Sequence, residues 1–149
     1  MSGYISSMLV MGGTQGMGYH CALALAQQCP SSLIVVACRT NPEDVGTSIN
    51  VKLRQSHVKF MPLNVGSLEK ERDFARSWDS GRFPPIQVLI INACVQCPGG
   101  VEYSVDGIEE TFAINHVGHA LLFHLLVPKL MHNARIMAVS SGVHDPVRK

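Results

Sequence analysis

Five apolar runs, rich in β-branched residues, recur along the chain and are separated by amphipathic stretches. These runs are Met8–Met11, Leu33–Cys38, Val58–Val65, Ile86–Asn92 and Ile136–Val139. Continuous apolar runs that alternate with helix-like segments are typical of strands buried on both faces of a parallel sheet. The pattern therefore predicts an α/β fold with a doubly wound parallel sheet.

Helix-start signals and one proline refine this prediction. Asn41-Pro42-Glu43-Asp44 offers a cap, a proline for the first helical position and acids for the first turn. Residues 67–71 (SLEKE) likewise offer a serine cap and acids for the first turn. Pro62 lacks the N–H that a central strand needs, so the third run should lie at a sheet edge. The strand order 3-2-1-4-5 places it there.

A glycine-rich turn, GGTQGMG (Gly12–Gly18), follows the first apolar run and precedes a helix-like stretch. A strand, such a turn and a helix form a phosphate site, because the free N–H groups and the dipole of the helix start favour an anion. We expect Gly12 to permit the tight turn, Gly16 the close approach of a diphosphate, and Gly18 the packing of helix on strand. A plain flexible turn is the alternative.

Composition narrows the class of protein. With 149 residues, 46% hydrophobic and 15% charged, the chain suits one domain, residues 1–149, and its net charge of +1 argues against nucleic acid as a partner. The longest apolar stretch, 120–130, is interrupted by His124, Pro128 and Lys129 and predicts no membrane-spanning segment. No secretory signal is recognisable, and the odd number of five cysteines, with Cys21, Cys29 and Cys38 in or beside apolar segments, suits a reducing cytoplasm.

Three further segments carry a resemblance. Asn92-Ala93 ends the fourth run, Asn115 lies in FAINHVG (112–118), and RIMAVSS (135–141) forms the fifth strand. In this order they resemble the short-chain dehydrogenase/reductase family, in which the turn reads T-G-x-x-x-G-x-G and N-N-A-G follows strand four. The wording DGIEETFAINHVGH (106–119) is similar to its retinol-dehydrogenase-like and protochlorophyllide-reductase-like branch. The resemblance covers essentially the whole chain.

The resemblance implies a Rossmann domain that binds NAD(P), transfers hydride, and acts on a small-molecule carbonyl or alcohol. By resemblance, the catalytic residues are Asn115, which holds a water of the proton relay, and Ser141, which hydrogen-bonds the substrate carbonyl; Ser140 is the weaker candidate. The cofactor-binding residues are Gly12, Thr14, Gln15, Gly16, Met17, Gly18, Arg39, Asn64, Val65, Asn92 and Ala93. Met11 and Cys94 depart from the family's Thr and last Gly.

The end of strand two bears on the choice of cofactor. NAD enzymes usually place an acid there, but this chain has Cys38-Arg39-Thr40. Arg39 could pair with a 2′-phosphate, which favours NADP(H) over NAD(H); a solvated arginine is the alternative. Asn64 stands where the family has an adenine-binding Asp, and the sequence leaves open whether it binds adenine or only shapes the turn.

Helical spacing predicts that Asn115 shares a core-facing stripe with Ile108, Phe112, Leu122 and Leu126. A buried amide needs partners, so Asn115 could equally be a structural core amide.

The catalytic Tyr-x-x-x-Lys of the family does not occur in these 149 residues, since Tyr4, Tyr19 and Tyr103 are followed four positions later by Met8, Leu23 and Gly107. We therefore interpret the chain as the amino-terminal part of the family domain, truncated after strand five and catalytically inactive. Its fifth strand becomes an open edge, which predicts an association-prone chain and with it a homo-oligomer; a monomer that unfolds sharply and reversibly would contradict this. The alternatives are a nucleotide-binding regulatory protein and a nonfunctional gene fragment.

Other reactive side chains predict no metal site. Cys94 and Cys97 form a C-x-x-C, but zinc would need two more ligands, so we interpret them as loop thiols. His116 and His119 lack an acid or cysteine partner at ligand spacing. The sequence around them is also typical of the branch that this chain resembles.

Overall fold

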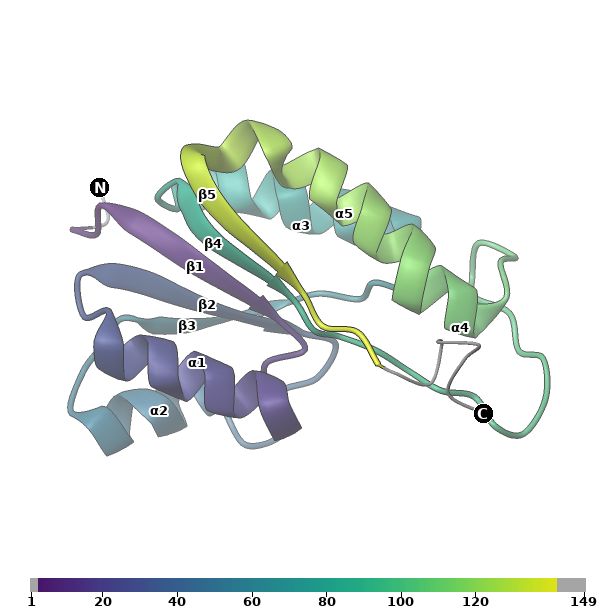
Figure 1. The fold of residues 1–149 in the computed structure, drawn as a ribbon, viewed down its shortest axis with the longest axis horizontal. Coiled ribbons are helices and arrows are strands. Elements are labelled where there is room, and N and C mark those ends of the chain that lie inside the picture. Colours follow the sequence, from purple (N-terminus) through teal and green to yellow (C-terminus); the bar gives the residue numbers. More distant parts are fainter. Residues whose placement is uncertain (1–2, 142–149) are drawn as a thin grey trace.

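The computed structural model describes residues 3–141 and shows a five-stranded parallel sheet (Figure 1). The strands are β1 (Ser6–Met11), β2 (Ser32–Cys38), β3 (Val58–Pro62), β4 (Ile86–Ile91) and β5 (Leu130–Ala138). Their order is β3-β2-β1-β4-β5, and every neighbouring pair is parallel. The predicted doubly wound α/β fold and strand order are confirmed.

Helices cover both faces of this sheet. On one face lie α1 (Gly16–Gln28) and α2 (Val45–Leu53), and on the other lie α3 (Leu68–Ser80) and α5 (His119–Leu126) (Figure 1). The connection from β4 to α5 is a long loop, residues 92–109, followed by α4 (Glu110–Phe112) and a π-helical segment, η1 (Ala113–Gly118). A short 3₁₀ turn, η2 (Val127–Lys129), follows α5.

The two helical layers create two apolar cores, one on each side of the sheet. Alternate residues of β1 contribute to each, so Leu9 packs in the core with Phe74 and Leu122, whereas Val10 packs in the core with Ala22 and Ile49. Because both faces of β1 are buried, its sequence from Met8 to Met11 is continuously apolar instead of alternating.

The two predicted helix starts fare differently. Ser67 caps α3 and accepts a hydrogen bond from the Lys70 N–H at 3.5 Å, as predicted. The prediction for α2 was wrong, because that helix begins at Val45 and not at Pro42. Asp44 adopts a left-handed conformation (φ 42°), and the Asn41 side-chain oxygen accepts from the Val45 N–H at 2.8 Å across the intervening turn. The acids thus precede the helix.

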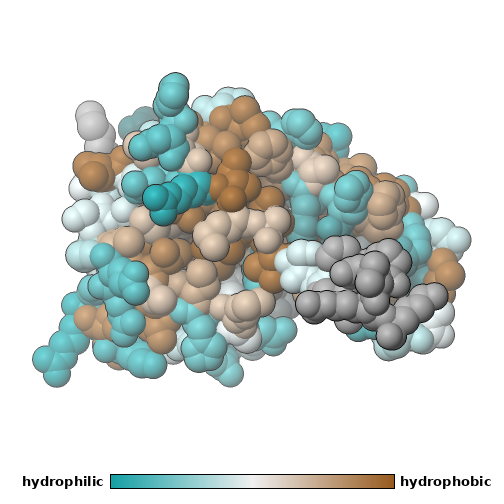
Figure 2. All heavy atoms as spheres, viewed as in Figure 1, coloured by the Kyte–Doolittle hydropathy of each residue, from teal (hydrophilic) through white to brown (hydrophobic). Residues whose placement is uncertain are grey.

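The two edges of the sheet are β3 and β5. Pro62 ends the edge strand β3, as its missing N–H predicts. β5 begins at Leu130, six residues before the predicted start at Ile136. Within the described residues β5 pairs only with β4, and Met137 on it is 55% exposed. Hydrophobic surface gathers where β5 faces the viewer (Figure 2). Association through this edge stays a prediction.

Candidate functional site

A cavity of about 480 Å³ opens at the carboxyl ends of β1, β2, β3 and β4. Parallel α/β sheets bind ligands at this edge, and the volume suits a small-molecule or cofactor site. Its lining residues are Gly12, Thr14, Gln15, Gly16, Tyr19, Ala37, Cys38, Arg39, Thr40, Pro42, Glu43, Leu63, Asn64, Val65, Ala93, Cys94, Val95 and Ile114.

The first part of the glycine turn, from Gly12 to Gly16, contributes to the cavity lining. Gly12 has φ +70°, in the left-handed region, and its N–H donates to the Ala37 carbonyl at 2.7 Å. A Cβ on Gly12 would lie 2.8 Å from the Ala93 Cα, so any side chain would collide with the strand-four loop. The turn is tight because only glycine fits there, as the sequence predicts.

Helix α1 points its amino terminus at the cavity. The first N–H groups of a helix have no partner within the helix, and the Gln15 cap residue forms no side-chain hydrogen bond to them among the described residues. Gly16 has φ +55°, and a Cβ there would meet nothing within 4 Å. Open space thus faces bare amide donors and a positive dipole end, an arrangement that favours an anion.

The remaining cofactor residues predicted on this turn and on strand four lie around the cavity but not in its lining. Met17 is 63% exposed at the start of α1. Gly18 packs under the turn, where a Cβ would collide with the Gly12 carbonyl oxygen. Asn92 donates from its Nδ2 to that same carbonyl at 3.1 Å. Asn92 therefore braces the turn.

The ends of β2 and β3 form another part of the cavity lining. Arg39 is exposed there, and no carboxylate of the described residues forms an ion pair with it. Asn64 lines the cavity while its Oδ1 accepts from the Gly66 N–H at 3.1 Å, which is the turn geometry that the sequence allowed. Val65 lies beside it in the lining.

Asn115 corrects the prediction of a core-facing amide. It is exposed, and so is Phe112 of the same stripe. The cause is η1, because a π-helical turn advances less per residue than an α-helix and shifts the stripe out of phase. Asn115 instead forms two hydrogen bonds with Val95, accepting from its N–H at 2.9 Å and donating to its carbonyl at 2.7 Å. It thereby holds the strand-four loop against the cavity.

Ser141 lies three residues beyond the end of β5 and is exposed. The backbone just before it is fixed at the site edge, because the Val139 N–H donates to the Ile91 carbonyl at 2.9 Å. Ser141 therefore follows the carboxyl end of β5, as Asn92 follows the carboxyl end of β4.

His119, four residues after Asn115, lies beside the backbone of Ala93 and Asn115. Burial lowers the pKa of His119, although contacts with those two backbone groups partly oppose the shift. The imidazole is therefore neutral near neutral pH and does not add a positive charge behind the cavity.

Several cavity residues were missed by the sequence reasoning. Tyr19 stands one turn into α1, Ile114 reaches the cavity from η1, and Glu43 adds an acid to the lining. Tyr19 is three residues after Gly16, and this spacing could have predicted that both lie on the same face of the helix start. Ile114 and Glu43 depend on tertiary packing and on the turn before α2.

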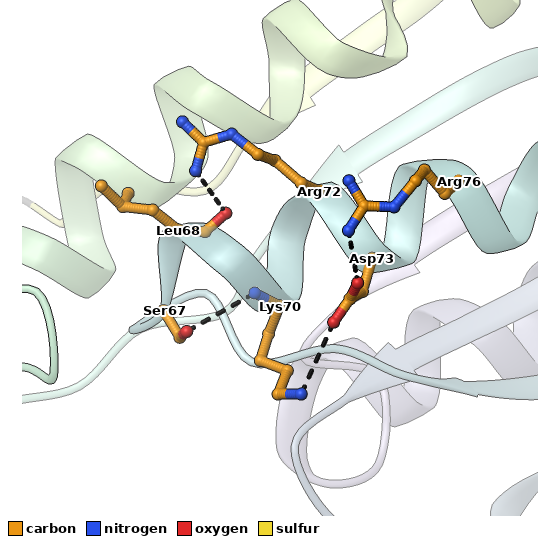
Figure 3. A network of polar contacts seen from close by, with 6 residues as sticks. All are labelled: Ser67, Leu68, Lys70, Arg72, Asp73 and Arg76. Carbon is orange, nitrogen blue, oxygen red and sulfur yellow. Dashed lines mark hydrogen bonds and ion pairs between the residues drawn. The ribbon is translucent and has the colours of Figure 1, made fainter.

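Polar contacts connect side chains and backbone along the first turns of α3 (Figure 3). Asp73 accepts from Arg76 at 2.6 Å and from Lys70 at 3.5 Å, and the bond from Arg76 is the main cause that lowers the Asp73 pKa. Arg72 donates to the Leu68 carbonyl at 2.9 Å. These pairs are exposed, so they fix local geometry more than they contribute to stability.

Comparisons with known proteins agree with this arrangement. A family model described as short chain dehydrogenase matches residues 6–146. The chain is 33% identical over 141 residues to a WW domain-containing oxidoreductase of Danio rerio, covering 92% of this chain and 33% of the relative. It is 34% identical over 143 residues to human retinol dehydrogenase 13, covering 93% of this chain and 42% of the relative.

A solved structure supports the fold. The alcohol dehydrogenase of the archaeon Thermococcus sibiricus, complexed with 5-hydroxy-NADP, superposes with a TM-score of 0.72 at 18% identity, covering 95% of this chain and 60% of that one. The chain thus spans between 33% and 60% of the length of these proteins. In the described part of the chain no helix has the length and apolarity needed to cross a membrane. With a family model matched along nearly all of its length, the chain belongs to the short-chain dehydrogenase family.

Proposed function

We propose that this chain is the NADP(H)-binding part of a short-chain oxidoreductase that reduces a carbonyl or oxidises an alcohol. The observation that supports it most is the bare amino terminus of α1 facing an open cavity at the carboxyl edge of the sheet. Anion binding at such a helix start needs no side chain, only N–H groups and room.

The residues present fit a dinucleotide. Gly16 leaves room for a diphosphate over the first amides of α1, and Asn64 and Val65 line the part of the cavity suited to adenine. When bound, the nicotinamide would supply or accept the hydride. Asn115 holds the loop that forms the neighbouring wall, and Ser141 would donate a hydrogen bond to the substrate oxygen.

Arg39 is proposed to set the preference for NADP(H). Its exposed guanidinium lines the cavity without a carboxylate partner among the described residues, so it can form a charge-assisted pair with a 2′-phosphate. Arg39→Ala is expected to weaken NADPH binding about tenfold, or about 1.4 kcal/mol, and to leave NADH binding unchanged. Calorimetric titration of both dinucleotides measures this.

The matched control is Arg72→Ala, which removes an exposed arginine that is outside the cavity lining. It should leave both affinities unchanged. Equal weakening of NADPH and NADH by Arg39→Ala would contradict a role in reading the 2′-phosphate.

The purified 149-residue chain is expected to show no turnover of NADPH with aldehydes or ketones. No Tyr-x-x-x-Lys is present in its sequence, and loss of a general acid–base group alone lowers rates by about a hundred- to ten-thousand-fold. Absorbance of NADPH, followed against a heat-treated sample, is the measurement. Steady oxidation above that control would show that another residue supplies the proton.

A further inference from the structure

Three metal-binding side chains converge on the loop between β4 and α5, outside the lining of the cofactor cavity. The Cys97 thiol and one carboxylate oxygen from each of Glu102 and Glu110 all lie within 4.8 Å of one another. Cys97 and Glu110 are partly buried, and Glu102 is exposed. The C-x-x-C of this loop supplies too few ligands for zinc by itself, and folding brings two carboxylates to its second cysteine.

Backbone contacts within this loop fix two of the three positions, Glu102 and Glu110. The Glu110 N–H donates to the Glu102 carbonyl at 2.8 Å, and Tyr103 and Glu109 form an antiparallel bridge. Residues 102 and 110 are therefore held opposite each other although eight positions separate them in sequence.

The charges of this cluster are not balanced by the protein. Glu102 and Glu110 are acidic neighbours, and neither forms a salt bridge with any cationic side chain among residues 3–141. Two carboxylates held this close repel each other, and a divalent cation between them would reverse the sign of that interaction.

We propose that Cys97, Glu102 and Glu110 bind one zinc-like divalent cation, with water as the fourth ligand. A thiolate combined with carboxylates suits zinc, whereas calcium and magnesium prefer oxygen ligands alone. Zinc–ligand distances of about 2.0–2.3 Å place neighbouring ligand atoms about 3.5 Å apart. Closing from 4.8 Å requires shifts of about 1 Å, which side-chain rotations at a partly exposed site provide. The Cys97 thiol releases its proton to solvent on binding.

The ion would connect the loop to the helix that follows. Glu110 is the first residue of α4, and the other end of the loop already forms the cavity wall through Cys94 and Val95. Asn115 holds that end at Val95, so the cation would fix the end that Asn115 does not reach. The site is independent of whether a dinucleotide binds.

Titration of the full chain with Co²⁺, under metal-free conditions with a thiol-free reductant, tests the site. We expect a near-ultraviolet absorption band from thiolate-to-cobalt charge transfer that saturates at about one equivalent of Co²⁺. Added Zn²⁺ should displace the Co²⁺ and remove the band. Cys97→Ser should abolish this absorption, and Glu102→Gln and Glu110→Gln should each weaken zinc binding by about tenfold or more. Cys94→Ser, in the same loop, is the matched control and should bind normally.

Thermal unfolding provides a second measurement that detects misfolded variants. Zinc should raise the melting temperature of the wild-type chain and of Cys94→Ser, but not of Cys97→Ser, because only the folded site binds. Each of three outcomes would overturn the proposal: no saturable absorption up to about millimolar cobalt, absorption that survives in Cys97→Ser, or absorption lost in Cys94→Ser.

Discussion

Glu71→Gln is expected to raise the free energy of unfolding at pH 7 by about 3 kcal/mol. Glu71 lies in the first turn of α3 with no exposed surface, and neither carboxylate oxygen has a hydrogen-bond partner in the described structure. Its Oε1 lies over Gly118 of η1, at a position that a Cβ on that glycine would touch. Burial raises the pKa of Glu71 to about 8, with Arg72 opposing the shift and Asp106 adding to it.

The direction of the pH dependence follows from that shift. The ordinary pKa of the unfolded glutamate is 4.5, so the unfolded chain releases the proton well before the folded one does. The contribution of Glu71 to the free energy of unfolding is fully present below about pH 4.5 and is lost as the pH rises through about 8. Between pH 5 and pH 7 the wild-type chain should lose about 2 to 3 kcal/mol, whereas the neutral amide of Glu71→Gln should not titrate.

Denaturant unfolding of both proteins from pH 5 to pH 8 measures this difference. Glu69→Gln is the matched control, because Glu69 is an exposed acid in the same helical turn. If the stabilities of the wild-type chain and Glu71→Gln changed in parallel across this pH range, Glu71 would not be a buried acid with a raised pKa.

Gly18→Ala is the second change with a large expected effect, on stability and on binding together. Its Cβ would collide with the Gly12 carbonyl oxygen and would lie 2.6 Å from the Asn92 Nδ2, so it would break the hydrogen bond that braces the turn. Overpacking of this kind lowers stability by about 1–3 kcal/mol. Displacement of the turn should also abolish measurable NADPH binding. Thermal unfolding and calorimetry report the two effects separately.

Gly16→Ala and Gly3→Ala are controls that add a methyl group without a steric collision. A Cβ on Gly16 meets open space, so only its left-handed backbone should lower stability, by about 1 kcal/mol, while the methyl group disturbs the ligand. Gly3→Ala meets nothing within 4 Å and should be silent. If Gly18→Ala were as stable as Gly3→Ala and bound NADPH normally, the described turn would be wrong.

The sheet could be predicted because its signals are local. Continuous apolar runs identify strands buried on both faces, and the missing N–H of Pro62 places β3 at the edge. β5 was placed too late because His132 and Asn133 interrupt its apolar pattern near an open edge, where polar side chains are tolerated.

The environment of individual side chains could not be predicted in the same way. The turn signals of residues 67–71 correctly give a capped α3, but only packing against η1 shows that Glu71 is buried while Glu69 is exposed. The helical stripe failed at Asn115 because no local signal announces a π-helical turn. Backbone irregularities of this kind depend on tertiary contacts.

The candidate site was predicted in outline. Gly12, Gly16 and Arg39 follow from spacing along the chain, and all three line the cavity. The convergence of Cys97 with two carboxylates depends on a loop that closes on itself, so sequence spacing offers no sign of it.

The most direct measurement follows the backbone amide resonances of the nitrogen-15-labelled chain during titration with NADPH. We expect the amides of Gly16, Met17 and Gly18, at the start of α1, to shift the most and to saturate together. Saturable binding whose largest shifts lie elsewhere, with these amides unmoved, would contradict diphosphate binding by the helix start.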